Sequence, residues 1–146
     1  MTGFIRYLAL TFALVSGCVD VQGGALEARW DIRNKLGERI GCDKAAASVG
    51  LSKLRFKVAP LDGADDPCET DDRCLFLCEG AEGDVVLGST PFMVPAASYA
   101  ISTVVLDSGG TILTPSDGVI SPSPVVRTVR EGEVTDMDVN LIIADR

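Results

Sequence analysis

The chain has 146 residues, a formal net charge of −8 at pH 7 and no histidine. This length gives room for one domain with a buried core, and 47% hydrophobic with 23% charged residues is typical of a globular protein. The negative charge argues against a nucleic acid partner, because phosphates attract basic surfaces. The absence of histidine excludes the usual catalytic triads and most zinc sites.

Residues 1–17 have the layout of a secretory signal peptide. Arg6 supplies a positive charge, an apolar stretch runs from Leu8 to Val15, and the small residues Ser16 and Gly17 follow. The apolar run is too short to cross a bilayer, which takes about 20 residues. We therefore predict that residues 1–17 are a signal peptide.

The end of this segment, Val15-Ser16-Gly17-Cys18, resembles the lipobox of bacterial lipoproteins. In that family the cysteine thiol is alkylated with diacylglycerol and becomes the mature N-terminus, so the resemblance implies lipidation of Cys18. Two or three acyl chains anchor a protein stably, since each buried methylene contributes about 0.8 kcal/mol. Val19 stands where enteric bacteria place an inner-membrane retention aspartate, so the resemblance favours the outer membrane. Ordinary signal peptidase cleavage, with Cys18 unmodified, is the alternative.

The cysteine count agrees with lipidation of Cys18. Five cysteines in an exported protein leave one without a disulfide partner, and the other four suit an oxidising compartment. Cys74 and Cys78 would lie about 13 Å apart on one strand, too far to bridge. Two pairings remain: Cys42–Cys78 with Cys68–Cys74, or Cys42–Cys74 with Cys68–Cys78. We prefer the first, because it closes one short loop and joins two strands; zinc binding is the rival interpretation.

Residues 18–24 carry the predicted lipidated cysteine and a short tether. The six residues after Cys18 extend at most about 20 Å, so we expect the domain at 25–146 to lie close to the bilayer. From residue 25 the apolar residues alternate with a period of two, which predicts β-strands. In 25–33 one face is apolar and the other charged; the two sets are Leu26, Ala28, Trp30 and Ile32, and Glu27, Arg29, Asp31 and Arg33.

Residues 34–47 are predicted to form a loop, followed by a strand with Leu54, Phe56 and Val58 inward. Val49 and Leu51 are out of phase with that set, which predicts a β-bulge near Ser52. Further strands are expected within 73–79, 84–94, 98–107, 111–114 and 133–143. We expect both faces of 73–79 to be buried, and the last segment to place Met137, Val139, Leu141 and Ile143 inward.

No long stretch has helical periodicity, and seven or eight short strands separated by turn signals predict an all-β, antiparallel β-sandwich of the Ig-like or prealbumin-like kind. The order of features resembles the prealbumin-like or carboxypeptidase-regulatory-like sandwiches of secreted bacterial proteins. The residues that carry this resemblance are Trp30, Gly41, Cys42, Phe76, Cys78, Pro95, Tyr99, Leu106, Asp107 and Gly110. Such domains are mostly structural, adhesive or binding modules, so the resemblance implies a non-catalytic role.

Two further motifs suggest chemistry. Asp107-Ser108-Gly109-Gly110 is similar to the nucleophile segment of chymotrypsin-like proteases, but no histidine exists to activate the serine, and a hairpin turn explains the residues. The loop at 62–72 is rich in carboxylates, which are the ligands that calcium prefers. The weak calcium candidates are Asp62, Asp65, Asp66, Glu69, Asp71 and Asp72. A solvated acidic loop is the simpler interpretation.

Together these observations predict a non-catalytic, lipid-anchored envelope protein with a structural or binding role and no cofactor. Its partners would be the membrane, through the anchor, and an envelope protein or a glycan. The alternative is a calcium- or carbohydrate-binding surface module that uses the acidic loop 62–72.

Overall fold

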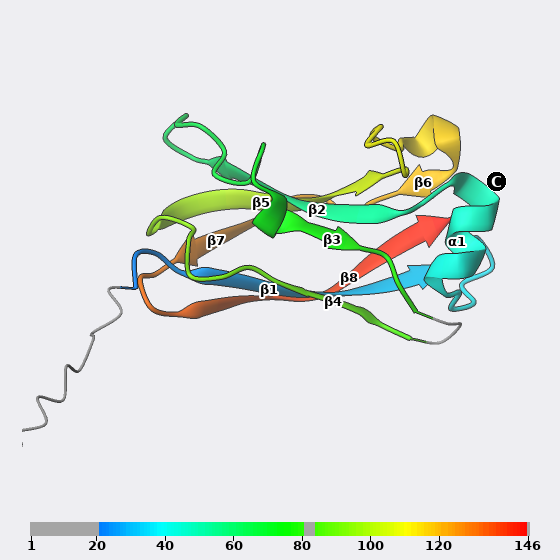
Figure 1. Ribbon diagram of the computed structural model, residues 1–146, viewed down its shortest axis with the longest axis horizontal. Helices are drawn as coiled ribbons and strands as arrows, with labels where there is room; N and C mark the ends of the chain where they lie inside the picture. The colour runs from blue at the N-terminus through cyan, green and yellow to red at the C-terminus, as the bar shows by residue number, and fades with distance from the viewer. Residues whose placement is uncertain (1–20, 81–83, 146) are drawn as a thin grey trace, which may run out of the picture.

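The computed structural model describes residues 21–80 and 84–145, so the predicted signal peptide and Cys18 lie outside the described residues. The described chain folds into two four-stranded sheets, with strand orders β4-β1-β8-β6 and β3-β2-β5-β7. The two sheets pack face to face as two layers (Figure 1). This confirms the predicted all-β sandwich.

The strands of the first sheet are β1 (Ala25–Arg33), β4 (Val86–Ser89), β6 (Val119–Ile120) and β8 (Val134–Ala144). Those of the second are β2 (Lys53–Pro60), β3 (Leu75–Leu77), β5 (Ala97–Leu106) and β7 (Val125–Val129). The strand pairs are antiparallel except β1 with β8, which run parallel. The antiparallel prediction is therefore incomplete, because the first and last strands pair side by side in the same direction. Within 21–80 and 84–145, no helix has the length and apolar character needed to cross a membrane.

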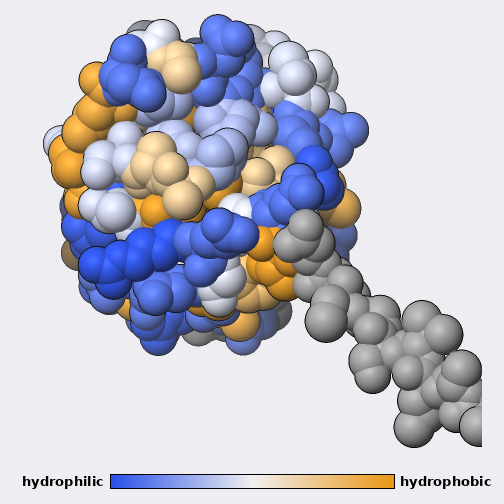
Figure 2. Space-filling model, turned by 90° about the vertical axis from the view of Figure 1, so that its left-hand side faces the viewer, coloured by the Kyte–Doolittle hydropathy of each residue, from blue (hydrophilic) through white to orange (hydrophobic). Residues whose placement is uncertain are grey.

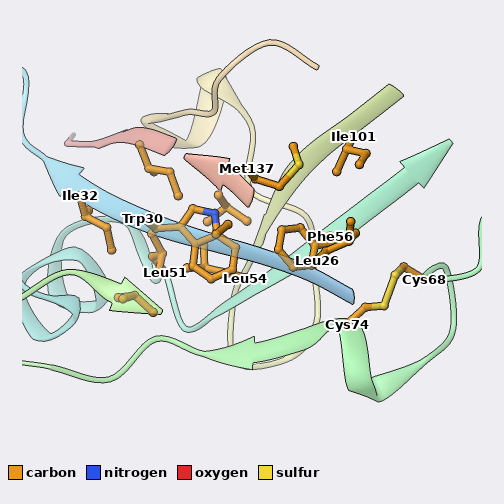
Figure 3. Close-up of a cluster of buried hydrophobic side chains, with 14 of the residues drawn as sticks. Leu26, Trp30, Ile32, Leu51, Leu54, Phe56, Cys68, Cys74, Ile101 and Met137 are labelled. Atoms are coloured by element: carbon orange, nitrogen blue, oxygen red, sulfur yellow. A yellow bond between two sulfur atoms is a disulfide. The ribbon is translucent and has the colours of Figure 1, made fainter. Parts of the chain in front are cut away.

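The core is centred on three aromatic rings from both sheets. Trp30 lies 5.4 Å from Phe56 and 5.5 Å from Phe76, measured between ring centroids. The indole Nε1 donates a hydrogen bond of 2.8 Å to the Thr103 hydroxyl on the opposite sheet. Figure 3 shows Trp30 beside Leu51 and Leu54, with Phe56 next along the core. On β4, Gly88 leaves room for the ring, since a Cβ there would stand 2.5 Å from it.

The predicted loop at 34–47 is wrong in its second half, where the helix α1 (Cys42–Val49) forms. It buries Cys42, Ala45 and Val49 and ends at Gly50, whose φ is 80°. Eight residues are too few to display a helical period clearly, and the run of alanines has the highest helix propensity. The phase change before β2 is therefore a helix-to-strand transition, and the predicted bulge near Ser52 is wrong.

The sheet instead has a register shift in β8. Glu27 of β1 pairs with Asp136 and Arg29 pairs with Val139, so β8 contains one extra residue there. Asp138 has a φ of 59°, and its N–H donates to Asp136 Oδ1 at 2.7 Å. After the bulge the buried residues are Ile142 and Ala144. Met137 is buried as predicted, but Val139 and Leu141 are 55% and 46% exposed, so their inward assignment is wrong.

Two smaller predictions also differ from the structure. Leu77 is 58% exposed, so 73–79 does not bury both of its faces. The segment 111–114 forms a single bridge, between Ile112 and Leu106, rather than a strand. In both cases the segment lies at the edge of its sheet, where apolar residues meet solvent more often than in a central strand.

Candidate functional site

The structure contains the disulfides Cys42–Cys78 and Cys68–Cys74, the arrangement preferred from the sequence. Cys68–Cys74 closes a short loop, as expected. Cys42–Cys78 differs from the expectation in one respect: it joins the first residue of α1, not a strand, to the residue that follows β3. Two disulfides in a domain of this size are typical of proteins that fold in an oxidising compartment.

The acidic loop 62–72 uses several of its carboxylates to hold its own backbone. Asp66 accepts hydrogen bonds from the N–H groups of Val58, at 2.9 Å, and Cys68, at 2.7 Å. Asp71 accepts from the guanidinium and the backbone N–H of Arg73, and these hydrogen bonds lower the pKa of Asp71 to about 2. Asp62 accepts from the N–H of Ala64 at 3.1 Å. These contacts explain the carboxylates as turn and loop residues.

The same loop does not gather its acidic side chains around one point. Asp62, Asp65, Glu69 and Asp72 are exposed. Among residues 21–80 and 84–145, no group of three or more Asp, Glu, Cys or His side chains is placed to hold a metal ion. The predicted calcium role therefore receives no support from the geometry of the loop.

A cleft lies between the acidic loop and the 107–112 turn, over the outer face of β2 and β5. Its volume is about 340 Å³, and Val104, Leu106 and Ile112 form its apolar part. Its charged lining consists of Arg55, Lys57, Asp66 and Glu69. Arg55 Nη1 donates to the backbone oxygen of Glu69 at 2.9 Å, while its buried Nε has no hydrogen-bond partner among residues 21–80 and 84–145. The cleft therefore offers apolar contacts beside both signs of charge.

The segment 107–110 forms a turn, as the sequence indicates. The N–H of Gly110 donates to the backbone oxygen of Asp107, and the carboxylate of Asp107 accepts from the N–H of Thr111. The backbone oxygen of Ser108 accepts a hydrogen bond from Lys53 Nζ at 3.2 Å. These contacts explain the residues of the protease-like motif as parts of a turn. The motif therefore gives no reason to assign Ser108 a role as a nucleophile.

Sequence reasoning missed a charged cluster on β1. Asp31 belongs to the charged face of 25–33, but it is only 4% exposed, and its carboxylate contacts Arg33 and Arg39. Its carboxylate accepts from Arg39 Nε at 2.7 Å and from Arg33 Nη2 at 2.9 Å. The hydrogen bond from Arg39, followed by those from Arg33, lowers the pKa of Asp31, although burial acts in the opposite direction. Only the turn at 34–38, which brings Arg39 back beside β1, could have signalled this contact.

We expect Asp31→Asn to destabilise the domain at pH 7 by roughly 1–2 kcal/mol, because hydrogen bonds between ionised groups are lost. The ordinary pKa of this carboxyl is 3.8 and the folded value is lower. The contribution is therefore present above pH 3.8 and disappears as the pH falls through the lowered pKa. Urea unfolding of both proteins between pH 2 and 7 should show two stabilities that converge in acid. A constant difference over that range would contradict this origin.

The N-terminal segment is fixed where it enters the sandwich. Gly24 donates to the backbone oxygen of Val94 at 2.8 Å, and Gly132 donates to that of Gly23 at 2.9 Å. Gly23 has a φ of 106°, and a Cβ on Gly24 would lie 2.5 Å from the backbone oxygen of Arg130. Both glycines are required by these close approaches. Gly23 and Gly24, the last two residues of the predicted tether, are thus fixed against the domain by hydrogen bonds.

Comparison with known proteins places the chain in no family. No family model matches it, and no curated protein matches its sequence. A solved structure, GBS52, the minor pilin of the Gram-positive pathogen Streptococcus agalactiae, is similar at a TM-score of 0.39 and 9% sequence identity. The match covers 84% of this chain and 46% of that chain, so the chain spans less than half the length of the pilin. A likeness at this level carries no argument about activity or partners.

Proposed function

We propose that this chain is an exported envelope lipoprotein, anchored through Cys18, whose β-sandwich has a structural or binding role. The observation that carries the proposal is the pairing of the cysteines. The chain has five, and the two disulfides join Cys42 to Cys78 and Cys68 to Cys74. Cys18 therefore has no cysteine left in the chain to pair with, and it stands at the lipidated position of the lipobox.

The positions of the side chains with shifted pKa values support a non-catalytic role. The carboxyls with a lowered pKa, Asp31 and Asp71, belong to ion pairs with arginines that fix a strand and a loop. Burial raises the pKa of Tyr99, whose hydroxyl donates to the backbone oxygen of Pro95 at 2.7 Å. Each of these groups is explained by local structure rather than by a reaction. Catalytic groups more often have shifted pKa values inside a cleft.

We expect Cys18→Ser to abolish membrane anchoring. The full-length gene product would be expressed in a Gram-negative host, and the membrane and soluble fractions would be compared for both proteins. Mass spectrometry of the N-terminal peptide should show diacylglycerol on Cys18 in the parent protein and an unmodified, unprocessed N-terminus in the variant. The parent should be found in the membrane fraction. Equal membrane binding and identical processing of the two proteins would refute the proposal.

A second candidate function is the binding of a polar ligand in the cleft beside the acidic loop. The specific observation is that Asp66 and Glu69, together with Arg55 and Lys57, line this cleft. A carbohydrate is the ligand class that suits this lining, because sugar hydroxyls can donate to carboxylates and accept from cationic side chains. Calorimetry with a glycan panel tests it, with Glu69→Gln as the matched variant. Heats that are equal for both proteins would remove this candidate.

A further inference from the structure

An uncharged loop lies at the end of the sandwich where the N-terminal segment enters. Residues 85–106 contain no Asp, Glu, Lys or Arg. Within this run the loop 91–96 exposes Pro91, Phe92, Pro95 and Ala96, while Val94 is buried and fixes the loop to the domain. Phe92 is 42% exposed. Figure 2 looks onto this end of the domain, where apolar side chains lie among charged ones.

This loop is held directly against the start of the domain. The N–H groups of Met93 and Val94 both donate to the backbone oxygen of Gly24, and Gly24 donates in return to Val94. A Cβ on Gly23 would lie 2.6 Å from the backbone oxygen of Val94. The loop 91–96 and the entry of the chain therefore form one rigid unit. Wherever the entry is held, the loop is held with it.

The distance from the proposed anchor to this unit is short. Cys18 and Gly23, the first residue hydrogen-bonded to the domain, are five residues apart, which permits at most about 18 Å between their Cα atoms. An acylated Cys18 has its chains in the bilayer and its backbone at the headgroups. The end of the sandwich that carries loop 91–96 must then lie within reach of the headgroup region. The opposite end is much farther away, because β1 alone spans roughly 27 Å.

The charges at the end of the sandwich that carries loop 91–96 determine which lipid surface this end can contact. Glu131 is exposed beside the loop, and Arg130 and Glu133 form an ion pair 3.6 Å apart in the same turn. The net contribution is acidic, so attraction to anionic lipid does not hold the domain there. Loop 91–96 itself carries no charge, and its exposed Phe92 favours the interfacial zone through its apolar surface.

We propose that loop 91–96 is a membrane-contacting surface, with Phe92 in the interfacial zone of a zwitterionic leaflet and the α1 end of the sandwich directed away from the bilayer. This inference depends on the proposed anchor at Cys18. It adds an orientation to the anchored domain: the cleft over β2 and β5 then lies on the side of the upright sandwich rather than beneath it.

Tryptophan quenching by lipid tests the orientation. The full-length lipidated protein would be reconstituted in phosphatidylcholine vesicles with and without brominated acyl chains. Trp30 is 0% exposed and is shielded from the bromines, so a second tryptophan can report on its own position. Phe92→Trp places the reporter in the loop. Leu36→Trp, at a residue that is 83% exposed at the far end of β1, is the matched control.

We expect brominated lipid to reduce the added fluorescence of Phe92→Trp at least twofold and to leave Leu36→Trp unchanged. If Phe92→Trp fails to fold, Ala96→Trp, at an exposed residue of the same loop, replaces it. The mass of the N-terminal peptide is measured on each sample. Equal quenching at both sites, or none at either, in a protein shown to be acylated overturns the orientation and leaves the anchor intact. An unmodified Cys18 overturns both.

Discussion

Trp30→Ala is expected to lower the free energy of unfolding by about 3–5 kcal/mol, the range for deleting a buried tryptophan. Trp30 is 0% exposed and lies within 5.5 Å of Phe56 and Phe76. Its removal leaves a cavity between the two sheets that the neighbouring β-strands cannot close. It also leaves the hydroxyl of Thr103, a residue only 6% exposed, without the indole N–H that it accepts from. Urea unfolding followed by circular dichroism measures the change.

Two matched variants separate packing from hydrogen bonding at this position. Trp30→Phe keeps an aromatic ring in the core but loses the N–H donor, so its cost should fall well below that of alanine. Thr103→Val removes the acceptor and leaves the indole N–H unpaired, which should cost about 1–3 kcal/mol. A loss below about 1 kcal/mol for Trp30→Ala would contradict the place of this ring at the centre of the core.

The fold could be predicted from the sequence because its strands have strong local signals. In β1 the apolar residues Leu26, Ala28, Trp30 and Ile32 alternate with charged ones, and all four are buried. Asp107 and Gly110 mark a turn through their own backbone preferences. These properties belong to short segments, and no distant contact is needed to produce them.

The rest depends on contacts between segments far apart in the chain. The exposure of Val139 and Leu141 follows from the bulge at Asp138, and this bulge is defined only by the register of β8 against β1, more than 100 residues earlier. The burial of Asp31 requires Arg39 to return beside β1 through the turn at 34–38. The cleft beside Glu69 forms because two loops, 62–72 and 107–112, meet over one sheet face. No local pattern contains this information.

The two disulfides should differ in their contribution to stability. Cys42 and Cys78 are 36 residues apart, whereas Cys68 and Cys74 are 6 apart. In the chain-entropy model a disulfide restricts the unfolded chain more when it closes a longer loop, which gives about 4 kcal/mol for the first and about 2 kcal/mol for the second. We therefore expect Cys42→Ala with Cys78→Ala to be the more damaging pair of substitutions.

The position of Cys42 increases this difference. It is the first residue of α1, a helix of eight residues that is too short to be stable by itself. Without Cys42–Cys78, α1 keeps only the packing of residues such as Ala45 and Val49, so its backbone amides should exchange faster with solvent. Guanidinium unfolding and hydrogen exchange of the two double variants measure both effects. Equal losses of stability, with α1 protected to the same extent in each variant, would show that loop length and helix attachment do not control the contribution of this disulfide.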